Sequence, residues 1–423
     1  MGRARAEKPV RIRELRVLEG PNLYFTRPAI KLTLGVGDWL RAPTRSMEAT
    51  ARRVRFPGPA ARANGMRPGA SRTDQRRRFV VRLAAHLTRE LARAAGARLA
   101  VRARPGPQPD EIVVAYPWRR RGAAEALGRE MGRLLTDLST GRRGLDRLLA
   151  DAADRLARVE PGPSPPLTDP LVPVVAVTGT NGKTTTVRLL AHLARTAGRT
   201  VAYSSTDGVY LDERLVEDGD YSGFGGAAIA LSQPGVEMAV LETARGGILL
   251  RGIGTTVNDV AVVTNVSADH LGLHGIETLD QLAEVKATVT RITRPDGWDV
   301  LNADDPRVLA MRRVARGRPW LFSLDPDHPA LRFALAEGGR GITVIDRRVT
   351  VLRPGRDPRP LASLEDVPVT LAGLSRHNTQ NALAATAAAL GAGLPERAVV
   401  GGLKTFVLDP DRNPGRTNLF ELN

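Results

Sequence analysis

The stretch from Val174 to Leu190, VVAVTGTNGKTTTVRLL, decides the fold of this chain. Its β-branched start predicts a buried strand, the glycines within Thr178–Thr186 predict a tight turn, and the apolar spacing from Val187 onward predicts a helix. A strand, a glycine-rich turn and a helix start, in this order, suit a bound anion. Glycines let backbone N–H groups approach the anion, and a helix N-terminus offers N–H groups that have no partner within the helix. The stretch therefore predicts a phosphate-binding loop in an α/β protein.

Two side chains of this turn carry the chemistry that a nucleotide requires. Lys183 is placed to reach β- and γ-phosphates, and the Thr184 hydroxyl suits Mg²⁺. The usual loop has its first glycine at the position of Val177, so the spacing here departs from the common pattern. An ordinary Gly/Thr-rich turn is the alternative, which the surrounding strand and helix disfavour. We expect a nucleotide phosphate tail and Mg²⁺ here, bound by Gly179, Thr180, Asn181, Gly182, Lys183, Thr184 and Thr185.

Length and composition limit the remaining possibilities. A chain of 423 residues is long enough for two or three domains with full cores. It contains no cysteine, which excludes disulfides, thiolate metal sites and a cysteine nucleophile. No stretch approaches the ~20 apolar residues of a membrane span, and the basic start lacks the apolar core of a signal peptide. We therefore expect a cytoplasmic protein without a membrane partner.

The net charge of +17 has two interpretations. One is a nucleic-acid partner, and the other is an Arg-, Ala-, Gly- and Pro-biased composition whose positive field serves anionic substrates. Basic runs such as 76–78 and 119–121 have few interleaved aromatic residues and are typical of solvated faces. Nucleic-acid binding is therefore disfavoured as the main function.

Residues 1–160 predict a small N-terminal α/β domain. Within it, Leu18 to Tyr24 predicts a turn, and 41–73 predicts a long loop because it is rich in Pro, Gly and Arg. Periodicity predicts strands at 10–18, 29–36, 99–104 and 111–116, and helices at 78–95, 121–135 and 144–157. Residues 161–170 are proline-rich and predict a stiff linker.

Residues 171–407 alternate strand and helix patterns, which predicts a mostly parallel sheet with helices on both faces. Residues 408–423 are expected to begin a further domain. The pair Thr278 and Gln281 predicts a capping box for a helix that runs to Arg294. The other expected elements are strands at 200–204, 238–242, 260–265, 299–302 and 320–323, helices at 306–316, 381–390 and 395–402, and β-hairpins over 333–370.

Polar residues follow several of these strands directly. In an open parallel sheet, ligands bind beyond the carboxyl ends of the strands. The glycine-rich turn, Glu242 and His270 each follow such an end, so they should meet at one edge. We therefore predict metal and phosphate roles for Thr184, Glu242 and His270. Taken singly, a surface carboxylate and a structural histidine are the alternatives.

These residues resemble the central ATP-binding domain of the Mur ligase superfamily. The similarity is closest to the cyanophycin synthetase family, over Val174–Leu422 in its C-terminal ligase half, and LEGPN at Leu18–Asn22 resembles its N-terminal domain. The family's ATP-grasp domain has no counterpart here, and the sequence stops at Asn423, where we expect the family's last domain to begin. The motifs that carry the similarity are Thr178–Thr186, Ser205–Tyr210, Glu242–Leu249, Asn265–Gly272, Lys286, His377–Asn381 and Gly415-Arg416.

The resemblance implies an ATP-dependent ligase that joins a small-molecule or peptide acid to the amine of an amino acid through an acyl phosphate. The alternatives are a poly-glutamate or cell-wall type ligase and a nucleotide-binding module that is inactive alone. Assembly into a homo-oligomer is a further alternative for its partners.

The resemblance also implies roles for single residues. Lys183, Glu242, His270 and Lys286 would be catalytic. Thr184 and Glu242 would hold one Mg²⁺, and His270 would hold a second Mg²⁺ or orient its waters, although imidazole is an unusual ligand for this ion. Lys286 matches a lysine that many Mur ligases carbamylate, and its alternatives are a solvated lysine or a plain phosphate contact. The residues implied to bind the nucleotide are Asn378 and Asn381 at the adenine, where Asn378 is otherwise an N-cap, and Arg416 at the phosphates. Asp207, Ser222, Arg245 and Arg251 are candidates for holding the acid, with ordinary loop residues as the alternative.

Overall fold

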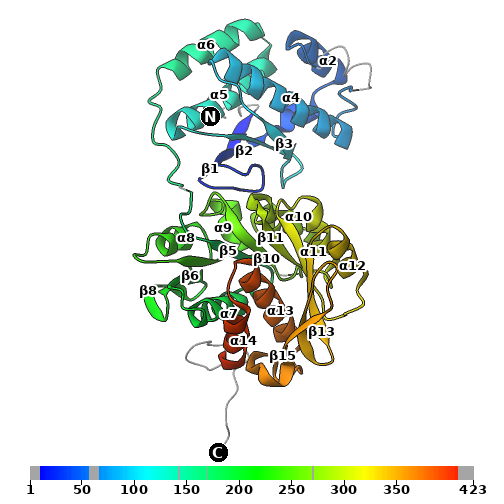
Figure 1. Cartoon of the computed structure of the whole chain (residues 1–423). Helices are drawn as coiled ribbons and strands as arrows, with labels where there is room; N and C mark the ends of the chain where they lie inside the picture. Colours follow the sequence, from blue (N-terminus) through cyan, green and yellow to red (C-terminus); the bar gives the residue numbers. More distant parts are fainter. Residues whose placement is uncertain (1–9, 57–65, 142, 168, 269–270, 408–423) are drawn as a thin grey trace, which may run out of the picture. The chain divides into compact units, whose positions relative to one another are not determined.

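The computed structural model describes residues 10–56, 66–141, 143–167, 169–268 and 271–407. The chain divides into two compact units, blue to cyan and green to red in Figure 1. The smaller unit comprises residues 1–19 and 27–166, and the larger comprises Gly20–Thr26 and residues 167–423. The short segment Gly20–Thr26 therefore lies in the larger unit, although its neighbours in sequence on both sides lie in the smaller one.

The described residues of the smaller unit form an antiparallel sheet in the order β1-β2-β4-β3. Alternate residues of the two central strands, such as Ile30, Leu32 and Val114, are buried against helices because successive side chains of a strand point to opposite faces. Its elements are β1 (Arg11–Leu18), β2 (Ala29–Gly35), α1 (Gly37–Arg41), α2 (Thr44–Arg53), α4 (Asp74–Ala94), β3 (Arg102–Pro105), β4 (Glu111–Pro117), α5 (Arg121–Thr140) and α6 (Leu145–Ala157).

The prediction of a long loop over 41–73 is wrong for part of that range. Thr44–Arg53 forms the helix α2, which buries Met47 and Ala51 on one face and exposes polar residues on the other. Only two apolar side chains mark the buried face, so the arginine-rich remainder obscured its helical period.

The described residues of the larger unit form one mostly parallel sheet in the order β15-β14-β13-β12-β11-β10-β5-β9-β6-β7-β8. The seven strands from β13 to β6 in this order run parallel, and antiparallel strands extend both edges. The predicted fold class is confirmed. The strands are β5 (Val174–Thr178), β6 (Val201–Ser205), β7 (Gly208–Leu211), β8 (Arg214–Asp218), β9 (Met238–Glu242), β10 (Asn258–Val263), β11 (Thr293–Asn302), β12 (Arg318–Phe322), β13 (Arg340–Ile345), β14 (Arg348–Leu352) and β15 (Arg359–Ser363).

Helices cover both faces of this sheet. Val175 and Val177 of β5 share a core with α7, α13 and α14, whereas Val174 points to the other face and packs in the core with α8. No helix that the structure describes is both long and apolar enough to cross a membrane. The helices and 3-10 turns are α7 (Lys183–Thr196), α8 (Phe224–Leu231), α9 (Arg245–Leu250), η1 (Leu273–Gly275), α10 (Leu279–Lys286), η2 (Thr290–Ile292), α11 (Pro306–Ala310), η3 (Met311–Arg313), α12 (Pro329–Ala336), η4 (Leu364–Asp366), η5 (Pro368–Thr370), α13 (Arg376–Gly391) and α14 (Glu396–Thr405).

Several predicted boundaries in this unit are wrong. The strand predicted at 299–302 begins at Thr293, and the helix predicted at 306–316 ends as α11 at Ala310 and continues only as the 3-10 turn η3. The capping box of Thr278 and Gln281 is present, but α10 ends at Lys286, because a run rich in β-branched residues follows and leads into β11. The predicted hairpins over 333–370 are confirmed only from β13 to β15, because η4 and η5 follow β15. Residues 333–336 belong to α12, which begins at Pro329, a residue that suits the first turn of a helix.

Candidate active site

The predicted phosphate loop connects β5 to α7. Its two glycines adopt φ angles that other residues rarely take, +155° at Gly179 and +83° at Gly182. Both also lie against other elements. A Cβ at Gly179 would be 1.8 Å from Thr264 Oγ1, and a Cβ at Gly182 would be 2.2 Å from Asn381 Oδ1. Both positions therefore require glycine, because the residue after β10 and the helix α13 leave no room for a side chain.

An asparagine beyond the end of β10 braces this turn. The Asn181 backbone N–H donates to Asn265 Oδ1 at 2.9 Å, and Asn265 Nδ2 donates back to the Asn181 carbonyl at 3.1 Å. The Thr180 N–H donates to the Asn265 carbonyl at 2.9 Å. Sequence reasoning gave Asn265 no role of its own, although its place directly after a buried strand was an available signal.

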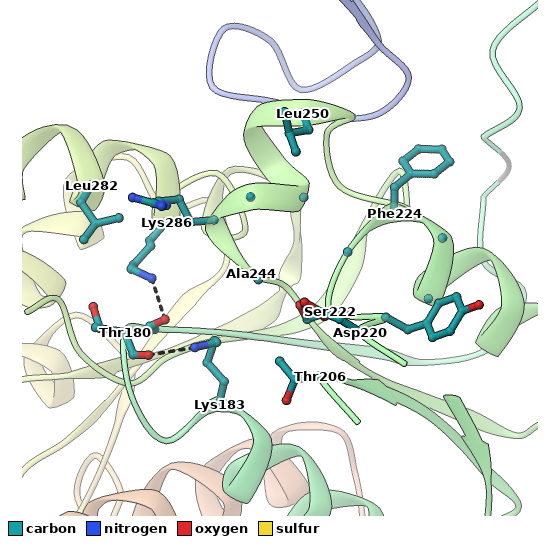
Figure 2. A pocket seen from close by; sticks show the side chains of 18 residues that line it. Thr180, Lys183, Thr206, Asp220, Ser222, Phe224, Ala244, Leu250, Leu282 and Lys286 are labelled. Atoms are coloured by element: carbon teal, nitrogen blue, oxygen red, sulfur yellow. Dashed lines mark hydrogen bonds between the residues drawn. The ribbon is translucent and has the colours of Figure 1, made fainter. Parts of the chain in front are cut away.

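Two lysines reach the carbonyls of the turn. Lys183 Nζ donates to the Thr180 carbonyl at 2.8 Å, and Lys286 Nζ donates to the Gly179 carbonyl at 2.6 Å. Figure 2 shows both amines directed at this loop. Because Lys286 is only 3% exposed, its interpretation as a solvated lysine is wrong. Both ammonium groups border the same cavity, where anionic phosphate oxygens would neutralise them.

Oxygen ligands gather beside the first turn of α7. Thr184 Oγ1 donates to Glu242 Oε2 at 2.9 Å, and Thr206 Oγ1 lies 3.3 Å from the Thr184 hydroxyl. Carboxylate and hydroxyl oxygens fit Mg²⁺, which prefers hard oxygen ligands. Thr206, which follows β6 directly, was missed by sequence reasoning. The third predicted metal ligand, His270, lies outside the described residues, and within the described part no three His, Asp or Glu side chains form a metal cluster.

The turn that carries Thr206 is held by an ion pair. Arg188 of α7, largely buried, donates to Asp207 Oδ2 at 2.8 Å. A guanidinium and a carboxylate in partly buried surroundings attract each other more strongly than an exposed pair. Asp207 therefore has a local structural partner and does not line the cavity.

The cavity beside the loop has a volume of about 590 Å³. The starts of α8 and α9 form one wall, which carries five glycines and thus presents backbone to the cavity. Of the four acid-binding candidates, Ser222 and Arg245 line the cavity, whereas Asp207 and Arg251 do not. The wall glycines are Gly223, Gly225, Gly226, Gly246 and Gly247.

The two predicted adenine ligands lie on α13 and are buried. Asn381 Nδ2 donates to Asn378 Oδ1 at 3.3 Å, so the two amides form one unit next to Gly182. The N-cap interpretation of Asn378 is wrong, because Ser375 caps this helix and its Oγ accepts the Asn378 N–H at 3.3 Å. Burial lowers the pKa of the neighbouring His377. The predicted phosphate ligand Arg416 lies outside the described residues.

Comparison with known proteins agrees with this architecture. Residues 177–389, half of the chain, match the family model described as the Mur ligase middle domain. This protein belongs to the Mur ligase family. The predicted membership of this superfamily is therefore confirmed.

Among curated relatives, the Mur ligase chain is 44% identical over 251 residues to cyanophycin synthetase from Synechocystis sp., covering 59% of this chain and 29% of the relative. It is 35% identical to UDP-N-acetylmuramoylalanine--D-glutamate ligase from Symbiobacterium thermophilum, covering 54% and 43% of the two chains. A solved UDP-N-acetylmuramoyl-L-alanyl-D-glutamate--2,6-diaminopimelate ligase matches with 21% identity and a TM-score of 0.46, covering 66% and 58%. The chain thus spans less than a third of the cyanophycin synthetase that it matches.

Proposed function

We propose that this protein is an ATP-dependent carboxylate–amine ligase. The observation that carries the proposal is a shared cavity: Lys183 and Lys286 of the nucleotide side face the same space as Ser222 and Arg245 of the glycine-rich wall. A cavity with phosphate-binding groups on one side and acid-binding groups on the other suits transfer of a phosphoryl group to a carboxylate.

The residues of the loop take the nucleotide. Backbone N–H groups near Gly182 and the Lys183 ammonium bind the β- and γ-phosphates, and Lys286, at the Gly179 carbonyl, adds positive charge to the same cavity. Thr184 and Glu242 would hold Mg²⁺, with His270 as a further ligand, and the ion supplies neutralisation of phosphate charge when bound. We assign adenine recognition to Asn378 and Asn381, and a phosphate contact to Arg416.

The acid is held against the nucleotide by the opposite wall. Arg245 and Ser222 orient the substrate carboxylate, one oxygen of which forms a bond to the γ-phosphorus while the bond to the β–γ bridging oxygen breaks. The products of this step are an acyl phosphate and ADP. The amine nitrogen then bonds to the acyl carbon, the carbon–oxygen bond to phosphate breaks, and the amine proton passes to solvent. The two lysines stabilise the negative charge on the transferred group.

The substrates that we favour are a peptide acid with an aspartate side-chain carboxylate and the amine of an amino acid, since the chain is 44% identical to a cyanophycin synthetase over 251 residues. We place the activity in the cytoplasm, where ATP is available. A glutamate or cell-wall type acid is the rival within the same reaction class. A module that binds nucleotide but is inactive alone is the rival of a different class.

ADP release by the full chain tests the proposal. The assay contains ATP and Mg²⁺, an amino acid mixture, and in turn an aspartyl-arginine dipeptide, poly-glutamate or UDP-N-acetylmuramoyl-alanine. We expect ADP release that requires one of the acids and an amine together. Nucleotide binding without acid-dependent ADP release contradicts the ligase and supports the inactive module. A Kd for DNA that rises steeply with salt concentration and does not change when ATP is added supports a nucleic-acid role instead.

A further inference from the structure

The segment Gly20–Thr26, which contains most of the LEGPN motif, has no role in the site described above. It forms a compact turn around Asn22, which is 1% exposed. Asn22 Oδ1 accepts the N–H groups of Tyr24 at 3.0 Å and Phe25 at 3.1 Å, and Asn22 Nδ2 donates to the Gly20 carbonyl at 2.9 Å. One buried side chain thus holds the backbone of the segment at Gly20, Tyr24 and Phe25.

This segment pairs with the backbone that follows α9. The Gly20 N–H donates to the Arg251 carbonyl at 3.2 Å, and the Ile253 N–H donates to the Pro21 carbonyl at 2.7 Å. The contact is too close for side chains. A Cβ at Gly20 would lie 1.9 Å from the Ile253 oxygen, and one at Gly252, where φ is +92°, would lie 2.6 Å from the Gly20 oxygen. Glycine is therefore required on both sides.

The backbone that the segment contacts follows α9 and packs against the start of α8, the other helix of the glycine-rich wall. Arg251 follows the last residue of α9, and its guanidinium carbon lies 4.4 Å from the ring centre of Phe224, the first residue of α8. A Cβ at Gly254 would lie 2.6 Å from the Phe224 carbonyl oxygen. Phe224 and Leu250, labelled in Figure 2, both line the cavity. Residues 251–254 thus fasten the end of one wall helix to the start of the other.

The wall itself has little tolerance for movement. The two helix starts approach closely at their glycines, since a Cβ at Gly247 would be 2.9 Å from the Cα of Gly223. The segment Gly20–Thr26 is itself held in place at Leu23, whose carbonyl accepts a hydrogen bond from Arg291 Nη1 at 3.3 Å. A shift of residues 251–254 would therefore change the position of the wall and the width of the acid side of the cavity.

From these contacts we propose that Gly20–Thr26 is a positioning element for the acid half of the ligase site. It holds α9 through residues 251–253, and so sets the affinity for the acid without contacting it. It does not act on the phosphate loop, which is braced separately by Asn265 and Asn381. The identity of the ligand as an acid rests on the proposed function, whereas the contacts that join the segment to the wall do not depend on it.

The test compares Gly20→Ala, which places a methyl group against the Ile253 oxygen, with Gly144→Ala, which has an ordinary φ of −72° and no atom within 4 Å. Hydrogen exchange is followed in peptides covering 244–254 and 183–196 of the full chain. In the same variants we measure the Kd for Mg·ADP, the KM for ATP, and the KM for the acid that gives the most ADP release. In Gly20→Ala we expect roughly tenfold faster exchange in 244–254 and a roughly tenfold higher acid KM. Exchange in 183–196 and both nucleotide constants should stay within about twofold of the wild-type values, and Gly144→Ala should match the wild type throughout.

Unchanged exchange in 244–254 of a folded Gly20→Ala variant overturns the proposal. Parallel changes in both peptides and in the nucleotide constants also overturn it, because they describe a general stabilising role. If Gly20→Ala does not fold, Asn22→Asp is a milder change: it keeps the acceptor for Tyr24 and Phe25 but places a carboxylate oxygen against the Gly20 carbonyl. If the wild type shows no acid-dependent ADP release, the proposed function fails, and the exchange contrast still decides the present inference.

Discussion

Replacement of Gly182 by alanine tests the phosphate loop with a single methyl group. Gly182 precedes α7 at a φ of +83°, and alanine in this left-handed region costs roughly 1–2 kcal/mol. The added Cβ would also lie 2.2 Å from Asn381 Oδ1, whereas ordinary contact begins at 3.4 Å. The turn or the amide must therefore move by about 1 Å. Because hydrogen bonds to charged groups contribute about 1.5–3 kcal/mol each, loss of one phosphate contact should weaken nucleotide binding at least about tenfold.

Gly198→Ala is the matched control for this change. Gly198 lies just beyond the other end of α7 at a φ of +79°, with no atom within 4 Å of an added Cβ. It therefore has the same backbone strain without the steric clash. Both variants should lower the melting temperature by about 2–4 °C per kcal/mol, but only Gly182→Ala should weaken Mg·ADP binding in calorimetric titrations. Equal nucleotide affinity in the two variants would refute the reasoning.

A double-mutant cycle identifies the atoms responsible. If the clash with the Asn381 side chain displaces the turn, Gly182→Ala should cost less affinity in an Asn381→Ala background than in the wild type. Additive losses would show that backbone strain, and not the contact with Asn381, accounts for the effect.

Three other changes probe the site and the core. Lys183→Ala should abolish acid-dependent ADP release and leave the melting temperature nearly unchanged. Turnover that survives in this variant contradicts the assignment of Lys183 to the phosphate loop. Glu242→Gln should raise the Mg²⁺ concentration needed for half-maximal nucleotide binding at least about tenfold, because a charged oxygen ligand is lost, and an unchanged requirement argues against Glu242 as a ligand. Burial raises the pKa of Asp299 to about 7 from 3.8. Between about pH 4 and pH 7 the native state therefore keeps a proton on Asp299 that the unfolded chain loses. The part of the free energy of unfolding that comes from this proton is fully present below about pH 4 and is lost as the pH rises through 7. Urea unfolding at pH 5 and pH 8 should show that Asp299→Asn removes this decrease, and an identical pH dependence in variant and wild type contradicts the assignment.

Elements whose signal is local were predicted well. The run of valines before Gly179 and the capping box at Thr278 each specify a strand or a helix start within a few residues, and the structure confirms both. The end of α10 and the helix at Thr44–Arg53 were missed. In these two places the local pattern is weak, and packing against the rest of the unit decides the outcome.

The sequence by itself determined the order of strand, turn and helix around Lys183, because side-chain branching and glycine act on the backbone of their own neighbourhood. Only the tertiary structure placed Asn265 and Asn381 against the turn, buried Lys286 and joined Gly20–Thr26 to the end of α9. These contacts unite residues far apart in the chain. Their partners are selected by the packing of strands and helices, which no local pattern of residues encodes.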